Sequence, residues 1–292
     1  MGMVDNIVEI NLTSLNTQIS NALNSDVVLY FGAIDFFTPD YFSNALANFL
    51  QKKDTLSIIL QTVGGPVEPV ERTVERIRNI YKYVNFIIPD YAMSAGTIFC
   101  MAGDKIYMRP ESSLGPIDPQ VRKPDGTYVP ALGYLEQLAK FIKKSKDKTI
   151  SPAEIDLLRQ LNLADLNLYE QAKNLTITLL KRWLVQYKFK DWDQHQTSPT
   201  KKGKPVTQKE KELRAKEIAE KLGDISIWHS HARHINLATL RKTLRLEIED
   251  YSLDAQLNQH INMFHALAMD YIQKNGYSLY VRAQNPTLIF RR

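Results

Sequence analysis

Hydrophobic residues in the first 110 positions alternate between short continuous runs and longer periodic stretches. Continuous apolar runs occupy residues 27–32, 56–62, 84–88 and 105–108, each with a glycine or proline within two residues of its end. Runs of this length are typical of parallel strands that are buried on both faces. Between the second and third runs, residues 68–83 carry apolar side chains at helical spacing. Strands that alternate with helices predict βαβ units and an α/β fold with a mostly parallel sheet.

The pattern becomes helical after Pro130. Residues 130–189 carry apolar stripes at helical spacing, the first of which comprises Leu132, Leu135, Leu138, Ala139 and Ile142. Residues 194–208 are polar and predict an exposed loop, and helices are expected over 210–222 and 253–273, followed by short strands at 277–281 and 287–290. We therefore expect an α/β core over residues 1–129 and a mainly helical extension over 130–292.

Composition adds limits to this picture. With 292 residues and 44% hydrophobic content, the chain can bury a sizeable core as one large domain or two small ones. The formal charge of +5 is concentrated in residues 140–148 and 201–216, which reads as solvated faces, so nucleic acid is not an expected partner. The single cysteine, Cys100, lies in an apolar helical stretch and predicts a small buried side chain.

The sequence shows no targeting signal, which favours a cytoplasmic protein. Residues 1–12 lack the basic start and apolar core of a signal peptide, and no stretch approaches the ~20 apolar residues that cross a bilayer. One cysteine allows no internal disulfide, which fits a reducing compartment. We expect a soluble, cytoplasmic protein without a membrane span.

Candidate chemistry follows two neighbouring strands. Gly64 and Gly65 come after the second strand, and Ser94 stands between small residues after the third, where a helical pattern begins. Such strand ends lie side by side in an α/β sheet, where backbone amides and a nucleophile can converge. Two structural readings compete with this one: the glycines would make a tight turn before the next helix, and Ser94 would cap the helix that it precedes.

Four ordered motifs carry a resemblance to a known family. They are QTVGG at 61–65, PDYAMSAGT at 89–97, AGDKIYM at 102–108 and LGPIDPQ at 114–120, with a looser block, SHARHI, at 230–235. In this succession the chain resembles the Clp-fold serine peptidases, and among them the serine dehydrogenase proteinase family, which is related to signal peptide peptidase A. Four blocks in order are far more specific than one Gly-Gly or Ser-Ala-Gly alone.

The resemblance implies a crotonase-like spiral of ββα units, peptidase activity and a homo-oligomer that is ring-like or trimer-based. Carried over by position, Ser94 is the nucleophile. Gly65 and Ala95 supply the amides of the oxyanion hole, with Gly64 in the same turn. Peptides or unfolded protein segments are the substrates that it implies.

The general base stays open at this stage. No histidine occurs between Ser94 and His195, so a triad in the usual chain order of the Clp peptidases is excluded. His231, oriented by Asp118, is one candidate, because triads recur in any chain order. Lys140 is the alternative, because signal peptide peptidases use a lysine, and such a lysine needs burial to lower its pKa. Asp118 has a structural reading as well, as the cap of a turn at Pro119.

The leading functional hypothesis is an ATP-independent serine endopeptidase that acts through an acyl-enzyme. No Walker-type motif occurs, and neither a cofactor nor a metal is expected, because no Asp or Glu lies among His229, His231 and His234. Two alternatives stay open. One is a non-catalytic oligomeric scaffold that keeps the fold and lacks the base, and the other is a crotonase-like enzyme acting on acyl-CoA.

Overall fold

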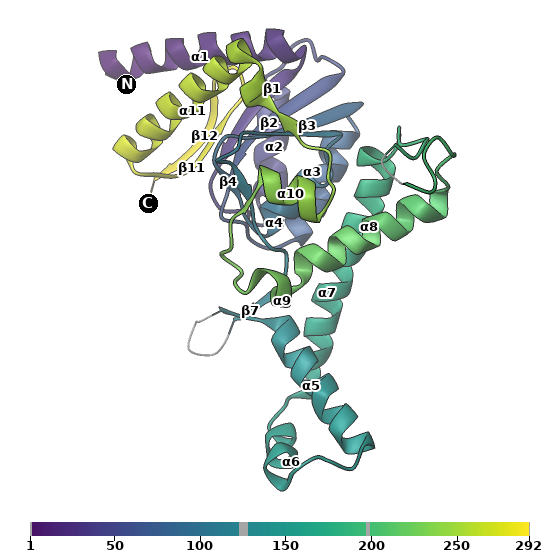
Figure 1. Cartoon of the computed structure of the whole chain (residues 1–292). Helices are drawn as coiled ribbons and strands as arrows, with labels where there is room; N and C mark the ends of the chain where they lie inside the picture. The colour runs from purple at the N-terminus through teal and green to yellow at the C-terminus, as the bar shows by residue number, and fades with distance from the viewer. Residues whose placement is uncertain (1, 123–127, 197–198, 292) are drawn as a thin grey trace.

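The central element of the fold is one twisted sheet, shown in Figure 1. The computed structural model describes residues 2–122, 128–196 and 199–291. Within these ranges seven strands pair in the order β10–β5–β3–β2–β1–β11–β12. Their bounds are β1 (Asp26–Phe31), β2 (Thr55–Gln61), β3 (Tyr83–Ile88), β5 (Lys105–Met108), β10 (Glu249–Asp250), β11 (Tyr277–Arg282) and β12 (Pro286–Arg291).

Most neighbouring strands of this sheet run parallel. The pairs from β10 through β5, β3 and β2 to β1 are parallel, and only β11 and β12 add antiparallel pairs at one edge. The expected α/β class with a mostly parallel sheet is confirmed. The four strands predicted from continuous apolar runs lie within one residue of β1, β2, β3 and β5.

Helices cover both faces of the sheet. Val27, Leu29, Ile59 and Ile87 point to one side, where they form a core with the helices α1 (Met3–Leu23) and α11 (Ala255–Asn275). The alternate residues of the same strands face the other side, where they pack with α2 (Thr38–Ala47), α3 (Glu68–Arg78) and α4 (Ala95–Cys100). Burial on both faces explains why these strands read as continuous apolar runs.

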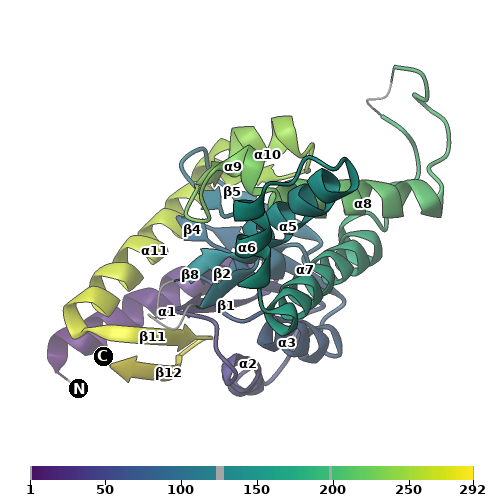
Figure 2. The ribbon, with the colours of Figure 1, turned by 90° about the horizontal axis from the view of Figure 1, so that it is seen from below.

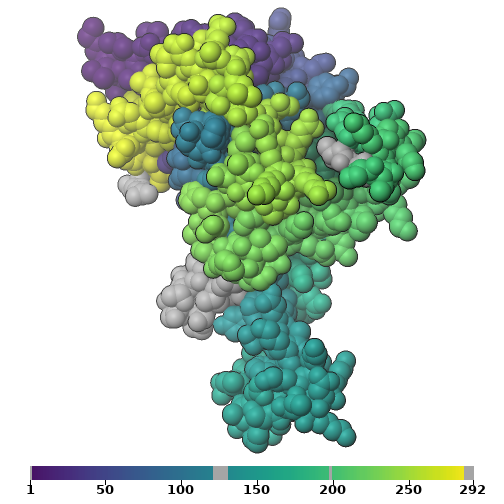
Figure 3. Space-filling model, in the orientation of Figure 1, coloured from purple at the N-terminus to yellow at the C-terminus, as the bar shows by residue number. Residues whose placement is uncertain are grey.

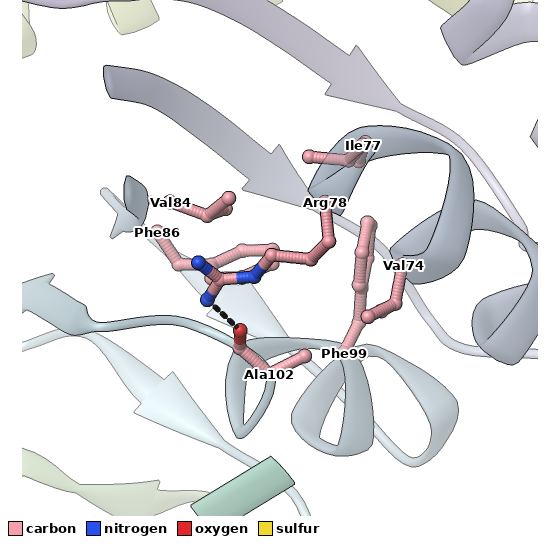
Figure 4. Close-up of a pocket in the computed structure, with 7 residues that line it drawn as sticks. All are labelled: Val74, Ile77, Arg78, Val84, Phe86, Phe99 and Ala102. Atoms are coloured by element: carbon pink, nitrogen blue, oxygen red, sulfur yellow. Dashed lines mark hydrogen bonds between the residues drawn. The ribbon is translucent and has the colours of Figure 1, made fainter. Parts of the chain in front are cut away.

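The helix that was expected over residues 68–83 ends earlier, at Arg78. Figure 4 shows the guanidinium of Arg78 reaching the carbonyl oxygen of Ala102, to which it donates a hydrogen bond. Arg78 also pairs with the carboxylate of Asp104 at 2.8 Å and lies 3.6 Å from the ring centroid of Tyr187. These contacts fix the end of α3 to the turn after α4. The chain then has the four residues 79–82 in which to turn before β3.

An arm projects from the body of the molecule after the short hairpin of β7 (Gln120–Arg122) and β8 (Tyr128–Pro130). It consists of α5 (Ala131–Lys146), α6 (Pro152–Arg159) and the first part of α7 (Leu163–Trp183), as Figures 1 and 3 show. The predicted apolar stripe of α5 therefore does not face a core along its length. Leu132 is buried at the base of the arm, whereas Ile142 is 46% exposed. The spacing of the stripe was helical, but only the base of α5 reaches the body.

The rest of the second half returns to the body. The π-helix η1 (Leu184–Lys188) extends α7, and α8 (Gln208–Gly223) packs back along α7 (Figure 2). The described residues of the predicted loop 194–208 are mostly exposed. The remaining elements are α9 (Ile225–Trp228), β9 (Ile235–Asn236), α10 (Leu237–Thr243) and the 3-10 helix η2 (Tyr251–Leu253).

The division into a core over 1–129 and an extension over 130–292 stays a prediction. The structure adds that β10, β11 and β12, all from the second part, belong to the central sheet. None of the helices in the described ranges combines the length and apolar character that spanning a bilayer requires.

A buried histidine on α11 makes the stability of the fold depend on pH. His265 Nε2 lies 2.6 Å from Oε1 of Gln61, and burial lowers the pKa of the imidazole from 6.5 to about 4. Below pH 6.5 the unfolded chain therefore gains a proton that the folded chain does not. We expect this to remove up to about 3 kcal/mol of stability as the pH falls from 6.5 to 4. His265→Gln lacks the titrating imidazole, so in urea unfolding its free energy of unfolding should fall less between pH 6.5 and 4 than that of the wild type. An equal fall for the two proteins would contradict this role of His265.

Candidate active site

A second, three-stranded sheet brings distant segments of the chain together. Its strands are β4 (Tyr91–Ala92), β6 (Ser113–Leu114) and β9, in that order, with β4 and β6 parallel and β9 antiparallel to β6. The carboxyl ends of β4 and β6 and the amino end of β9 therefore share one edge. Ser94 follows β4, Asp118 follows β6 and His231 precedes β9, each within four residues of its strand. The topology thus places the three residues at the same edge.

The end of β2 runs alongside this edge. The Met93 N–H donates to the carbonyl oxygen of Thr62 at 2.9 Å, and the Thr62 N–H donates to that of Tyr91 at 3.3 Å. This pairing carries Gly64 against the Ser94 turn. A Cβ on Gly64 would lie 2.8 Å from Cβ of Ser94 and 2.7 Å from the carbonyl oxygen of Met93, and φ of Gly64 is +96°. No side chain fits at this position.

Gly65 is confined from the opposite side. A Cβ at Gly65 would lie only 1.9 Å from the carbonyl oxygen of Ile34, in the loop after β1. The same loop is tied to the glycines by the Ile34 N–H, which donates to the Gly64 carbonyl oxygen at 2.8 Å. The paired glycines are therefore held between the loop after β1 and the Ser94 turn, and their peptide planes are fixed by both.

The backbone amides at this point differ in what they bind. The Gly64 N–H donates to Oγ1 of Thr62 at 3.0 Å, so it is engaged inside the turn. The Gly65 N–H has no acceptor among the described residues. Ala95 is the first residue of α4, where N–H groups have no helical acceptor. Two of the three amides expected in an oxyanion hole are thus available to a ligand, and that of Gly64 is not.

Ser94 adopts a backbone conformation that side chains rarely take. Its φ and ψ are 51° and −119°, and it occupies the N-cap position of α4 without a side-chain capping hydrogen bond. The capping role that the sequence left open is therefore not what the hydroxyl does. Non-glycine residues in such regions cost about 1–3 kcal/mol and concentrate at functional sites. The side chain is half-buried at the junction of strand and helix.

His231 and Asp118, which are 113 positions apart, form a direct pair. Nδ1 of His231 lies 2.8 Å from Oδ1 of Asp118. The carboxylate is buried, with Asp118 only 1% exposed, and its other oxygen accepts a hydrogen bond from Gln120 at 2.6 Å. Because the carboxylate accepts from Nδ1–H, the Nε2 atom of a neutral imidazole keeps its lone pair. The partly exposed ring of His231 can therefore take a proton from a neighbouring group.

Lys140 lies elsewhere. It is exposed in the second half of α5, on the arm that projects from the body (Figure 1). Without burial, nothing in its surroundings supplies the desolvation that a lysine base requires.

The structure also contains a serine–histidine contact that sequence reasoning missed. Nδ1 of His234 lies 2.6 Å from Oγ of Ser113, which is 3% exposed. Ser113 belongs to β6, and His234 directly precedes β9, so the contact fastens the two strands where they pair. The neighbouring His229 is exposed and ends α9 in the left-handed region. In the described ranges, no group of three or more His, Cys, Asp or Glu side chains is arranged to hold a metal ion.

Comparisons with known sequences identify a family. The model of the family described as "ClpP-like SDH-type serine proteinase" matches residues 47–200, more than half of the chain. Two curated relatives from Methanocaldococcus jannaschii, both described as uncharacterized, are each 32% identical, over 146 and 100 residues or 47% and 34% of this chain. The chain matches about half of the length of the first (49%) and a third of that of the second (32%).

Solved structures with a similar chain path include two mutants of the 1510-N membrane-bound stomatin-specific protease, one of them in complex with a substrate peptide. Their identities are 14% and 16% and their TM-scores 0.45 and 0.42, covering 89% and 77% of this chain and 87% and 75% of theirs. A mutant of ClpP1 from Listeria monocytogenes covers 53% of this chain and 81% of its own, at 20% identity and a TM-score of 0.28.

A buried threonine fixes the edge that carries the site. Oγ1 of Thr97 accepts from the Gly115 N–H at 2.9 Å and lies 2.9 Å from the carbonyl oxygens of Ala92 and Gly115. Thr97→Val keeps the shape and removes these hydrogen bonds, so we expect a loss of about 1–3 kcal/mol in the free energy of unfolding. Thr97→Ser keeps the hydroxyl and should lose less than Thr97→Val in chemical denaturation. Equal losses for the two variants would contradict the role of the hydroxyl.

Proposed function

The chain belongs to the ClpP-like SDH-type serine proteinase family, and we propose that it is a serine endopeptidase that cleaves peptides or unfolded segments through an acyl-enzyme. Ser94 is the nucleophile, His231 is the general base and Asp118 orients the histidine. The observation that carries this proposal is the Asp118–His231 pair, which lies at the same sheet edge as the Ser94 turn.

The backbone of Ser94 supports its role as nucleophile. A serine at a sharp strand-to-helix turn presents Oγ to substrate, and here the hydroxyl is not engaged in capping the helix. A serine hydroxyl attacks a carbonyl only when a base takes its proton. Nε2 of His231 is the atom that we assign to this task, because Nδ1 is held by the buried carboxylate. The proton moves from Oγ to Nε2 as the bond from Oγ to the carbonyl carbon forms, and it then passes to the leaving amine.

The oxyanion hole that we propose consists of the N–H groups of Gly65 and Ala95. Ala95 directly follows Ser94, and Gly65 directly follows Gly64, which packs against the Ser94 turn. Gly64 itself is excluded because its N–H donates to Thr62. The negative charge of the tetrahedral intermediate would be stabilised by these two donors. Loss of one such donor typically costs about 3–4 kcal/mol of transition-state stabilisation.

The alternative general base, Lys140 in a Ser–Lys dyad, has less support, because that lysine is exposed on the arm. A crotonase-like enzyme acting on acyl-CoA needs a carboxylate as acid or base. The carboxylate of Asp118 is already engaged by His231 and Gln120.

A cytoplasmic location stays a prediction, and assembly of several copies is part of the proposal.

Covalent labelling tests the nucleophile without knowledge of the substrate. A fluorophosphonate probe phosphonylates only an activated serine, so we expect one modified peptide, carrying Ser94, in mass spectrometry. Ser94→Ala should abolish labelling while leaving the circular dichroism spectrum and elution volume unchanged. A folded protein that is not labelled would support the scaffold alternative. Turnover of an acyl-CoA that persists in Ser94→Ala would support the crotonase-like one.

The rate of the same labelling identifies the base. We expect His231→Ala to slow labelling by at least about a thousandfold, because Ser94 then has no proton acceptor. Asp118→Asn should slow it as well, since an amide no longer holds the productive tautomer of His231. Lys140→Ala is the matched control and should stay within about twofold of the wild type, in keeping with a surface substitution. If Lys140→Ala loses labelling and His231→Ala keeps it, the assignment of the base is wrong.

A further inference from the structure

A cavity of about 480 Å³ is lined by residues of α5, α7, α8 and the start of α9. Figure 1 shows how these helices are arranged. Its lining includes Ile117 and Pro119, which flank Asp118 in the chain, and Asp224, in the segment that leads to His231. The Ile117 N–H donates to the Leu222 carbonyl oxygen at 3.0 Å, which joins the Asp118 segment to the end of α8. The cavity thus lies against the segment that carries Asp118.

The walls of the cavity are of two kinds. Its inner surface is apolar, with Ile117 and Leu132 at 3% and 8% exposure and the buried Ala219 beside them. Its outer part carries charges from Glu136, Glu220, Asp224 and Lys173. Three carboxylates against one ammonium give this part an excess of two negative charges at neutral pH. An apolar stem that ends in a cation, as in lysine and arginine, matches both kinds of wall.

The three carboxylates are not equally free to bind a substrate. Glu220 lies 3.6 Å from Lys216, and Asp224 accepts hydrogen bonds from the backbone and hydroxyl of Ser226 at 2.8 and 2.6 Å. Glu136 forms no ion pair within the described part of the chain. Glu136 is therefore the carboxylate with the most to gain from a cation that enters the cavity.

We propose that this cavity is a specificity pocket for a lysine or arginine side chain of the substrate, next to the bond that is cut, with Glu136 as the main determinant. This inference rests on the proposed peptidase function and adds the class of substrate. The methylene groups of the lysine or arginine side chain would displace water from the apolar wall, and its charged end would pair with Glu136 at the outer end of the cavity. Lys173, on the facing helix, opposes the cation and limits the preference.

Cleavage-site mapping provides the test. The full chain is first shown to label at Ser94 and is then incubated with a peptide library, and the cut sites are read by mass spectrometry. We expect lysine and arginine to be enriched at one position beside the cut. Matched peptides with Lys, Leu or Glu at that position then give ratios of kcat/KM.

Charge-reversal variants assign the preference to residues. In the Glu136→Lys, Glu220→Lys double variant, the ratio of kcat/KM for the Lys peptide to that for the Glu peptide should fall by about tenfold or more. Lys173→Gln should raise the same ratio. The Glu75→Lys, Glu170→Lys double variant makes the same change of charge at two exposed positions that do not line the cavity, and it should leave the ratio unchanged.

The outcomes separate the two proposals. If Ser94 is not labelled, the peptidase function fails and the pocket loses its premise. If Ser94 is labelled but cut sites favour apolar or acidic residues, the specificity proposal alone is overturned. The same holds if the two double variants change the ratio equally, because the effect would then come from net charge and not from the cavity.

Discussion

The pairing of the end of β2 with β4 is the constraint on which the site depends. Through the hydrogen bonds between Thr62, Tyr91 and Met93, two strand ends that are about thirty residues apart in sequence become neighbours. Gly64 then lies against Ser94 so closely that a side chain is excluded, and Gly65 is confined by the carbonyl oxygen of Ile34. The strained backbone of Ser94 is tolerated because both sides of its turn are fixed by these contacts.

The second constraint is the placement of β9 beside β6. It joins a segment near residue 235 to one near residue 114, and the Ser113–His234 contact fastens this junction. The pairing brings His231 to the buried carboxylate of Asp118, although the chain between them forms the whole arm and α8. The arm can therefore project from the body without disturbing the sheet edge that carries the proposed catalytic groups, and its base contributes Leu132 and Glu136 to the cavity.

Local pattern predicted the four central parallel strands and the proximity of the glycine and serine turns, and for a physical reason. A strand buried on both faces must be apolar throughout, so β1, β2, β3 and β5 are visible as continuous runs. The same reasoning missed α1, although Leu12, Leu15 and Ile19 have helical spacing and are buried against α11 and the sheet. It also extended α3 past Arg78, and it identified the apolar stripe of α5 without showing that most of the stripe lies away from the body, because spacing shows which face is apolar and not whether another element covers it.

The sequence by itself determined the class of fold, the residues of the Ser94 turn and the short set of candidate bases, because these follow from residue types at local spacing. Only the tertiary structure decided which candidates meet. It paired His231 with Asp118, left Lys140 exposed on the arm and engaged the Gly64 amide with Thr62. Such choices depend on strand order and on contacts across more than a hundred residues, which no local pattern of side chains encodes.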